Sequence, residues 1–188
     1  MPLAAQISPK RKGRRGTELV EFTMVLLPFL SILFVLVDVS WAIFAKSTII
    51  YAVRTGVRYG ITITGTQVTT ASQLCGCSSS LTQMVKDSVQ ANALGFLNGT
   101  AGRSYIQVHY FTQDSTSSTG LTDVSTLPSG NSPGNLMQVS VTNFPLPGLV
   151  PRIYYWFTAA DKSAANLSAV SADKIEPSGD IPPIGTAP

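Results

Sequence analysis

The chain has 188 residues, only 12% of them charged, and a formal net charge of +3 at pH 7. This length has room for one modest domain plus an anchor. Residues 10–15 hold 5 of the 13 basic residues, so the rest of the chain carries 8 basic and 10 acidic residues, a net charge of −2. A basic stripe on a folded surface is therefore excluded, and we expect no nucleic-acid partner.

An apolar segment of 27 residues, Leu19 to Ala45, follows the basic cluster. A helix of this length measures about 40 Å, more than the roughly 30 Å of a hydrocarbon core. A buried core helix and a cleaved secretory signal are the alternatives, but the segment is longer than is typical of either. The positive-inside rule then predicts a cytoplasmic N-terminus and an exported C-terminal part.

Two carboxylates, Glu21 and Asp38, interrupt this segment. Asp38 lies about 32 Å along the helix from Thr17, which places it near the far membrane interface, close to Trp41. Glu21 lies just inside the segment, where a charge must be paired, neutralised or extended to the headgroups. If the chain is cut after Gly16, the new amine of Thr17 can pair with Glu21 of the same helix or of a neighbouring one. Snorkelling of Glu21 to the headgroups remains the alternative.

The residues from Gly16 to Phe22, around the carboxylate of Glu21, resemble a type IV prepilin cleavage site. Gly16, four further residues and then Glu21-Phe22 follow the basic leader and precede the apolar helix. In that family a membrane aspartyl protease, the prepilin peptidase, cuts after the glycine, and the glutamate takes part in filament assembly. The resemblance therefore implies a processing site formed by Gly16, Thr17, Glu21 and Phe22, and helix packing through Glu21.

Residues beyond the apolar segment narrow the resemblance to one family. The stretch Ala52-Val53-Arg54-Thr55-Gly56-Val57-Arg58-Tyr59 is similar to the Ala-Ala-Arg-x-Gly-Ala-Arg stretch of TadE-like proteins, the pseudopilins of tight-adherence (Flp-type) pili. Residues 167–176 look like the closing strand of that family. The resemblance implies a minor component or assembly factor of such a pilus.

The same resemblance implies partners and a location. The partners would be the prepilin peptidase, other pilus subunits and pseudopilins, and the lipid bilayer. The protein would reside in the inner (cytoplasmic) membrane or enter the pilus, with its N-terminus cytoplasmic and its C-terminal domain periplasmic or extracellular. The alternative is a membrane-anchored extracytoplasmic binding domain unrelated to pili.

The residues after the span predict an α+β fold, in which the long N-terminal transmembrane helix continues into a small exported domain with a second helix and a short antiparallel sheet. Apolar and small residues at helical spacing predict the continuation: Ile49, Val53, Val57 and Gly60. Ser80 is expected to cap the second helix, and Asn98-Gly99 to end it. Residues 105–112, 137–144 and 167–175 have strand-like patterns.

This gives five expected regions along the chain. They are a cleaved basic cytoplasmic leader (1–16), the transmembrane helix (17–45), a stalk helix (46–60), the exported α+β domain (61–176) and a disordered tail (177–188). Residues 112–135 are rich in Ser, Thr and Gly, which predicts a long, mobile loop.

Chemistry-bearing residues are sparse. Cys75 and Cys77 are candidates for metal ligands, a redox pair, a disulfide or free thiols, and an oxidising exterior favours the disulfide. Without a second cluster, and with His109 as the single histidine, they fall short of a zinc site, so we expect no metal and no cofactor. Tyr154–Phe157 is expected to pack in the core or to contact the membrane interface or another subunit. The sequence contains no nucleophile elbow, phosphate loop or His-Glu metal motif, so we expect that this protein is not an enzyme.

Overall fold

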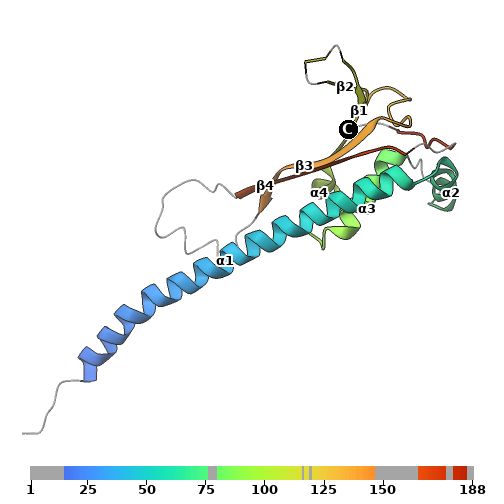
Figure 1. Ribbon diagram of the computed structural model, residues 1–188. Helices are drawn as coiled ribbons and strands as arrows, with labels where there is room; N and C mark the ends of the chain where they lie inside the picture. Colours follow the sequence, from blue (N-terminus) through green and yellow to red (C-terminus); the bar gives the residue numbers. More distant parts are fainter. Residues whose placement is uncertain are drawn as a thin grey trace, which may run out of the picture. The chain divides into compact units, whose positions relative to one another are not determined.

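The protein is described by a computed structural model that covers residues 15–75, 80–115, 117–118, 120–146, 165–176 and 180–185. In chain order its elements are α1 (Arg15–Thr62), α2 (Gly65–Cys75), α3 (Leu81–Asn92), α4 (Gly99–Ser104), β1 (Ile106–Gln113), β2 (Leu121–Asp123), β3 (Leu136–Leu146) and β4 (Ala165–Lys174) (Figure 1). The chain divides into two compact units, Met1–Ser40 and Trp41–Pro188. The α+β fold predicted from the sequence is confirmed.

The second unit contains an antiparallel sheet with the strand order β2-β1-β3-β4. Val108 of β1 lies opposite Val139 of β3, which lies opposite Ser171 of β4. The three strands predicted from alternating patterns correspond to β1, β3 and β4. A register shift between Val141 and Phe144 interrupts the pairing of β3 with β4, and Asn143 adopts a φ of 54° within it. Asn tolerates this left-handed conformation better than most residues do, so the irregularity suits the sequence.

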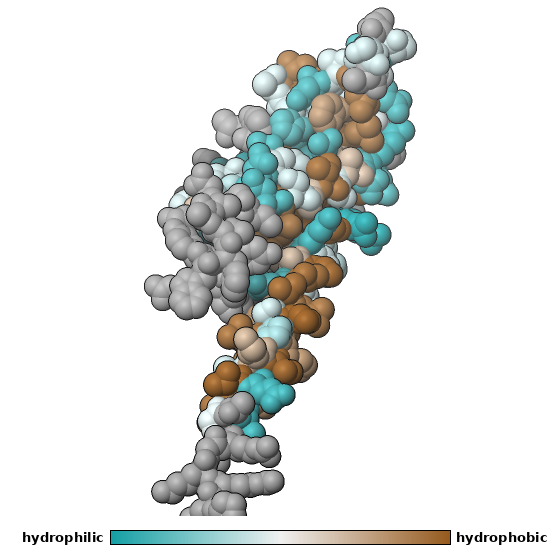
Figure 2. All heavy atoms as spheres, turned by 90° about the vertical axis from the view of Figure 1, so that its left-hand side faces the viewer, coloured by the Kyte–Doolittle hydropathy of each residue, from teal (hydrophilic) through white to brown (hydrophobic). Residues whose placement is uncertain are grey.

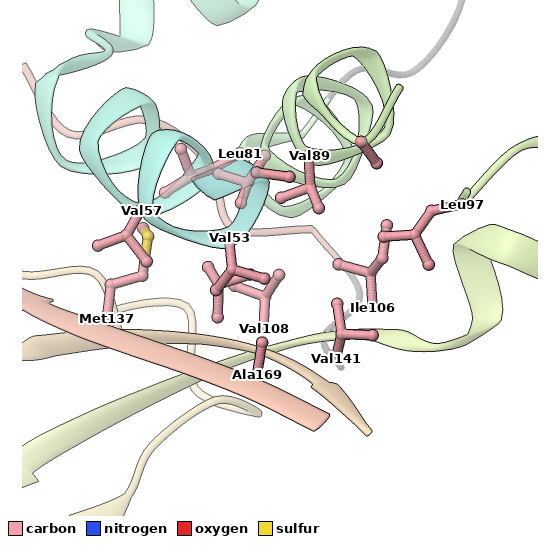
Figure 3. Packing of buried hydrophobic residues seen from close by; sticks show 14 of the residues in the cluster. Val53, Val57, Leu81, Val89, Leu97, Ile106, Val108, Met137, Val141 and Ala169 are labelled. Atoms are coloured by element: carbon pink, nitrogen blue, oxygen red, sulfur yellow. The ribbon is translucent and has the colours of Figure 1, made fainter. Parts of the chain in front are cut away.

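Side chains of α1 and α3 converge on one face of this sheet, as Figure 3 shows. The core that they form is fully buried and includes Val53, Val57, Leu81, Val89, Val108 and Met137. Two glycines of α1 allow the close approach. A Cβ atom at Gly56 would lie 2.3 Å from Cγ2 of Val89, and one at Gly60 would lie 2.6 Å from Sδ of Met137. The helical spacing read from the sequence therefore corresponds to the packed face of α1.

The second predicted helix is present but ends earlier than expected. The hydroxyl of Ser80 accepts a hydrogen bond from the Gln83 N–H at 3.4 Å, so Ser80 caps α3 as predicted. The helix ends at Asn92, because Leu94 and Gly95 adopt positive φ values of 47° and 89°. Asn98 and Gly99 do not end this helix as predicted; they begin α4.

Helix α2 lies in a stretch rich in Ser, Thr and Gly, a composition that is more typical of a loop. One apolar side chain, Val68, is buried along it, and most of the remaining residues are polar and exposed. A helix with so little apolar surface depends on contacts from elsewhere in the chain. Asp180 supplies such a contact at the N-terminus of α2, where its Oδ2 accepts the N–H of Thr66 at 2.8 Å.

The C-terminal segment 177–188 was expected to be disordered, whereas its described part, residues 180–185, packs against the domain. The carbonyls of Pro183 and Ile184 accept the N–H groups of Leu81 and Thr82 at 2.8 and 3.2 Å. The side chain of Ile184 is only 3% exposed. This segment therefore satisfies the free N–H groups at the start of α3, a long-range pairing that composition does not reveal.

The segment 112–135, expected to be a mobile loop, contains β2 and a series of hydrogen-bonded turns. Ser125 and Asn131 are buried in it. The Asn131 amide donates to the carbonyl of Pro182 at 2.5 Å, which ties this segment to the C-terminal one. Small polar residues of the kind that suggest flexibility instead bond to backbone groups and fix the turns.

Candidate membrane-spanning and assembly site

Within the described residues, one helix is long and apolar enough to cross a membrane, and it covers Glu18–Thr62 of α1. Its most apolar window contains no buried residue. Figure 2 shows hydrophobic side chains over the surface of this helix. At least 60% of each of these side chains is exposed: Leu19, Val20, Phe22, Met24, Val25, Leu27, Phe29, Ile32 and Leu36. An apolar surface of this extent is typical of a membrane or protein contact, and a core helix would have buried it.

Two hydroxyl groups inside the apolar segment are satisfied within the helix. The Thr23 hydroxyl donates to the carbonyl of Leu19 at 2.7 Å, and the Ser40 hydroxyl donates to that of Leu36 at 2.8 Å. Neither hydroxyl then requires water, which a hydrocarbon core does not supply. Pro28 lies inside the helix and lacks the N–H that would bond to the carbonyl four residues earlier. Neighbouring helices can satisfy such a carbonyl in a membrane.

The residues of the expected processing site lie on the first turns of α1. Gly16 is exposed, with no heavy atom within 4 Å of the position a Cβ would take. Phe22 is 64% exposed, and Glu21 is exposed as well. Among the described residues, no side chain packs against Gly16, which lies at the start of α1.

Glu21 places a carboxylate on the exposed apolar surface of this helix. No hydrogen bond or ion pair to it occurs among the described residues. Thr17 lies four residues earlier, which in an α-helix is one turn away on the same face.

Residues 52–59 of α1 present two different faces. Ala52, Val53 and Gly56 are buried against the domain. Arg54 and Arg58, which lie four residues apart, are exposed. The small and apolar positions of this stretch serve packing, and its two guanidinium groups remain accessible to a partner.

His109, Asp123 and Ser125 come together beside β1, in an arrangement that does not activate the serine. One carboxylate oxygen of Asp123 lies 3.1 Å from Nδ1 of His109, and the other accepts both the hydroxyl and the N–H of Ser125. The carboxylate thus lies between the hydroxyl and the imidazole, whereas nucleophilic catalysis needs the imidazole next to the hydroxyl. The Ser125 hydroxyl also accepts the N–H of Tyr110 at 2.8 Å, so this cluster ties the turn after β2 to β1.

The protonation of Asp123 reflects these contacts. Desolvation raises the pKa of its carboxyl, but the hydrogen bonds from Ser125, and then His109, outweigh it and hold the pKa below its usual value. This cluster was not predicted from the sequence. The Asp-x-Ser spacing of residues 123–125 is typical of turns stabilised by a side chain and is the signal that could have indicated it.

The remaining predicted site residues are not brought together in the described parts of the chain. Cys77 and Tyr154–Phe157 lie outside the described residues, as does the side chain of Cys75. The predicted disulfide therefore stays a prediction. No group of three or more His, Cys, Asp or Glu side chains able to hold a metal ion occurs among the residues that the structure describes.

A comparison with protein families supplies the context for this helix. Residues 16–58 match the family model described as TadE-like protein. The match begins at the glycine of the expected cleavage site and ends at Arg58. No curated protein and no solved structure matches the chain. The TadE-like family consists of pilus components and is not known for enzymatic activity. Residues 16–58 are thus similar to TadE-like proteins, which is consistent with a component associated with the tight-adherence pilus.

Proposed function

We propose that this chain is a pseudopilin-like minor component or assembly factor of a tight-adherence pilus. It spans the inner membrane once through α1, with the basic leader in the cytoplasm and the α+β domain exported. One observation carries the proposal: the family match, residues 16–58, begins at Gly16 and includes the exposed apolar surface of α1 that starts three residues later at Leu19. A membrane anchor of any kind explains the apolar surface, but it does not explain the position of the match.

The first step in this function is cleavage by the prepilin peptidase after Gly16. The accessibility of Gly16 and Phe22 supports this step. Cleavage removes the five basic residues of the leader and creates an amine at Thr17. The mature chain then begins with a cationic group one helical turn before Glu21.

The second step is the packing of α1 against the helices of other subunits. Because Glu21 has no partner among the described residues, its charge must be met from elsewhere once it leaves water. The amine of Thr17 on a neighbouring subunit neutralises it and sets the register of the two helices. The apolar side chains around Glu21 form the rest of the contact.

The mature N-terminus tests the first step. Intact mass and N-terminal sequencing should give a chain that begins at Thr17 when the protein is isolated from cells with the complete pathway. Cells that lack the prepilin peptidase should yield a chain that begins at Met1. A start at Met1 in both strains contradicts processing, and a start at Lys46 indicates ordinary secretion and favours an exported domain unrelated to pili.

A further inference from the structure

The turn between α3 and α4 holds an exposed leucine in an unusual backbone conformation. Leu94 has a φ of 47°, and 71% of it is exposed. The left-handed region is unfavourable for a bulky side chain, and exposure to water is unfavourable for an apolar one. Backbone strain of this kind is concentrated at functional sites, which makes Leu94 a candidate for a contact.

This turn is held in place from both sides. Ala93 and Leu97 are fully buried on either side of Leu94. The side-chain amide of Gln90 donates to the carbonyls of Leu97 and Gly99 at 2.6 and 3.0 Å. The outward position of Leu94 is therefore set by the fold, because both ends of its turn are anchored.

Phe96 places the turn beside the part of α1 that follows the apolar segment. Its ring centroid lies 5.5 Å from that of Trp41 and 6.3 Å from that of Phe44. Trp41 and Phe44 also contact each other, with their centroids 5.9 Å apart. Trp is one of the two aromatic residues that are enriched where a membrane protein crosses the interface.

The exposed apolar surface of α1 continues as far as this cluster. Ile43 and Phe44 are 64% and 47% exposed, whereas Ala45 is fully buried against the domain. Lys46 follows and is exposed, as suits the level of the lipid headgroups. The turn itself, residues 93–99, contains no charged residue. An uncharged tip with an exposed leucine thus lies next to the end of the span.

We propose that the turn between α3 and α4 is a second membrane contact, in which Leu94 inserts into the interface of the leaflet on the exported side. This rests on the proposed span through α1. The cluster of Trp41, Phe44 and Phe96 fixes the depth of the turn relative to the end of the span. Two attachments limit rotation and tilt of the exported domain about α1, so the domain faces neighbouring subunits in a defined orientation.

Fluorescence quenching in the full chain tests this contact. The protein carries Cys75→Ser and Cys77→Ser and a single cysteine labelled with an environment-sensitive dye. It is placed in vesicles of phosphatidylethanolamine and phosphatidylglycerol with brominated acyl chains. Leu94→Cys is the test position, and cysteine is smaller than the leucine that already adopts this φ. Leu33→Cys in the apolar segment is the positive control.

Leu74→Cys is the matched negative control. Leu74 is 85% exposed and lies on α2, which follows the C-terminal end of α1. That end, Thr62, lies about 32 Å along the helix from Trp41. We expect brominated lipid to quench the labels at 94 and 33, and aqueous iodide to quench the label at 74. The emission of the label at 94 should also be blue-shifted relative to the label at 74.

Three outcomes overturn the proposal. If the label at 33 is quenched by lipid but the label at 94 behaves like the one at 74, the span stands and the second contact does not exist. If the label at 94 is shielded from both quenchers, another protein copy covers the turn. If neither the label at 33 nor the label at 94 is quenched by lipid, the span fails, and the second contact fails with it.

Discussion

Asp180 caps helix α2 from the far end of the chain. Its Oδ2 accepts the N–H and the hydroxyl of Thr66 at 2.8 and 2.7 Å, although the two residues are 114 positions apart. The same carboxylate explains why residue 65 is a glycine, since a Cβ there would lie 2.4 Å from Oδ1 of Asp180. The hydrogen bonds from Thr66 hold the pKa of Asp180 below its usual value. Residues 180–185 are thus part of the folded domain.

Replacement of Asp180 should destabilise α2 locally. In Asp180→Ala the N–H of Thr66 loses its acceptor, so amide exchange along Gly65–Cys75 should accelerate while exchange in the sheet stays unchanged. Asp180→Asn keeps an acceptor oxygen without the charge and should have a smaller effect. Hydrogen exchange followed by mass spectrometry measures both variants. Equal exchange of α2 in Asp180→Ala and the wild type would show that the cap has no role in its stability.

Gly56 should not tolerate a methyl group. In Gly56→Ala the new Cβ would lie 2.3 Å from Cγ2 of Val89. Overpacking of a core typically costs 1–3 kcal/mol, and the higher helix propensity of Ala offsets about 1 kcal/mol of it. We expect a net loss of up to about 2 kcal/mol in the free energy of unfolding, measured by chemical denaturation in detergent.

The second variant in this test is Val89→Ala, which removes the methyl groups that the new Cβ would meet. Combined with Gly56→Ala, it should destabilise the domain by less than the sum of the two single changes. Additive losses would mean that α1 and α3 separate without a direct contact at this pair.

The cluster around Asp123 should make stability depend on pH in the acid range. Because the pKa of this carboxyl is lower in the folded chain than its unfolded value near 3.9, its contribution is present above that value. It is lost as the pH falls through the folded pKa. Denaturation midpoints of the wild type and Asp123→Asn should therefore differ near neutral pH and converge once the pH has fallen below the folded-state pKa of Asp123. The side chain is 48% exposed, so solvent screening keeps the difference small. If the stability difference between the two proteins persists unchanged at low pH, it arises from lost packing and not from the charge of Asp123.

Local patterns made much of the fold predictable. The spacing of Val53 and Val57 indicated the packed face of α1, and Ser80 before an apolar periodicity indicated the start of α3. The alternation around Val139 and Val141 indicated β3. In each of these cases the residues that decide the structure lie within a few positions of one another, so a short window contains the whole signal.

The missed features depend on residues that are distant in sequence. Thr66 needs Asp180, and Asn131 needs the carbonyl of Pro182, so α2 and the turns of 112–135 look like loops when read alone. The candidate site also combines a local sequence pattern with contacts between residues that are distant in sequence. Gly16 and Glu21 form a local pattern that the sequence contains in full, whereas the contact of Phe96 with Trp41 and Phe44 appears only when the chain is folded.

The charge of Glu21 should matter for association with other subunits. If this carboxylate pairs with the Thr17 amine of a neighbouring subunit, Glu21→Gln should leave cleavage and insertion intact but weaken association with other pilus subunits. The amide keeps the size of the side chain and still accepts hydrogen bonds, so the change removes the charge pairing alone. Hydrogen bonds within membranes are worth about 0.6 kcal/mol and at most about 2, and a charge-assisted contact belongs at the upper end. A loss of about 1.4 kcal/mol per contact lowers association about tenfold.

Glu18→Gln is the matched control, because Glu18 is an exposed carboxylate on the same first turns of α1 but lies outside the glycine–glutamate pattern. Crosslinking and co-purification of both variants, at matched levels of processed protein, should show fewer partner subunits with Glu21→Gln and unchanged recovery with Glu18→Gln. If Glu21 instead extends to the headgroups, its neutralisation removes a charge from the membrane and leaves association unchanged. Equal recovery with both variants would therefore remove Glu21 from the assembly contact, while an equal loss with both would point to the overall charge of the helix start.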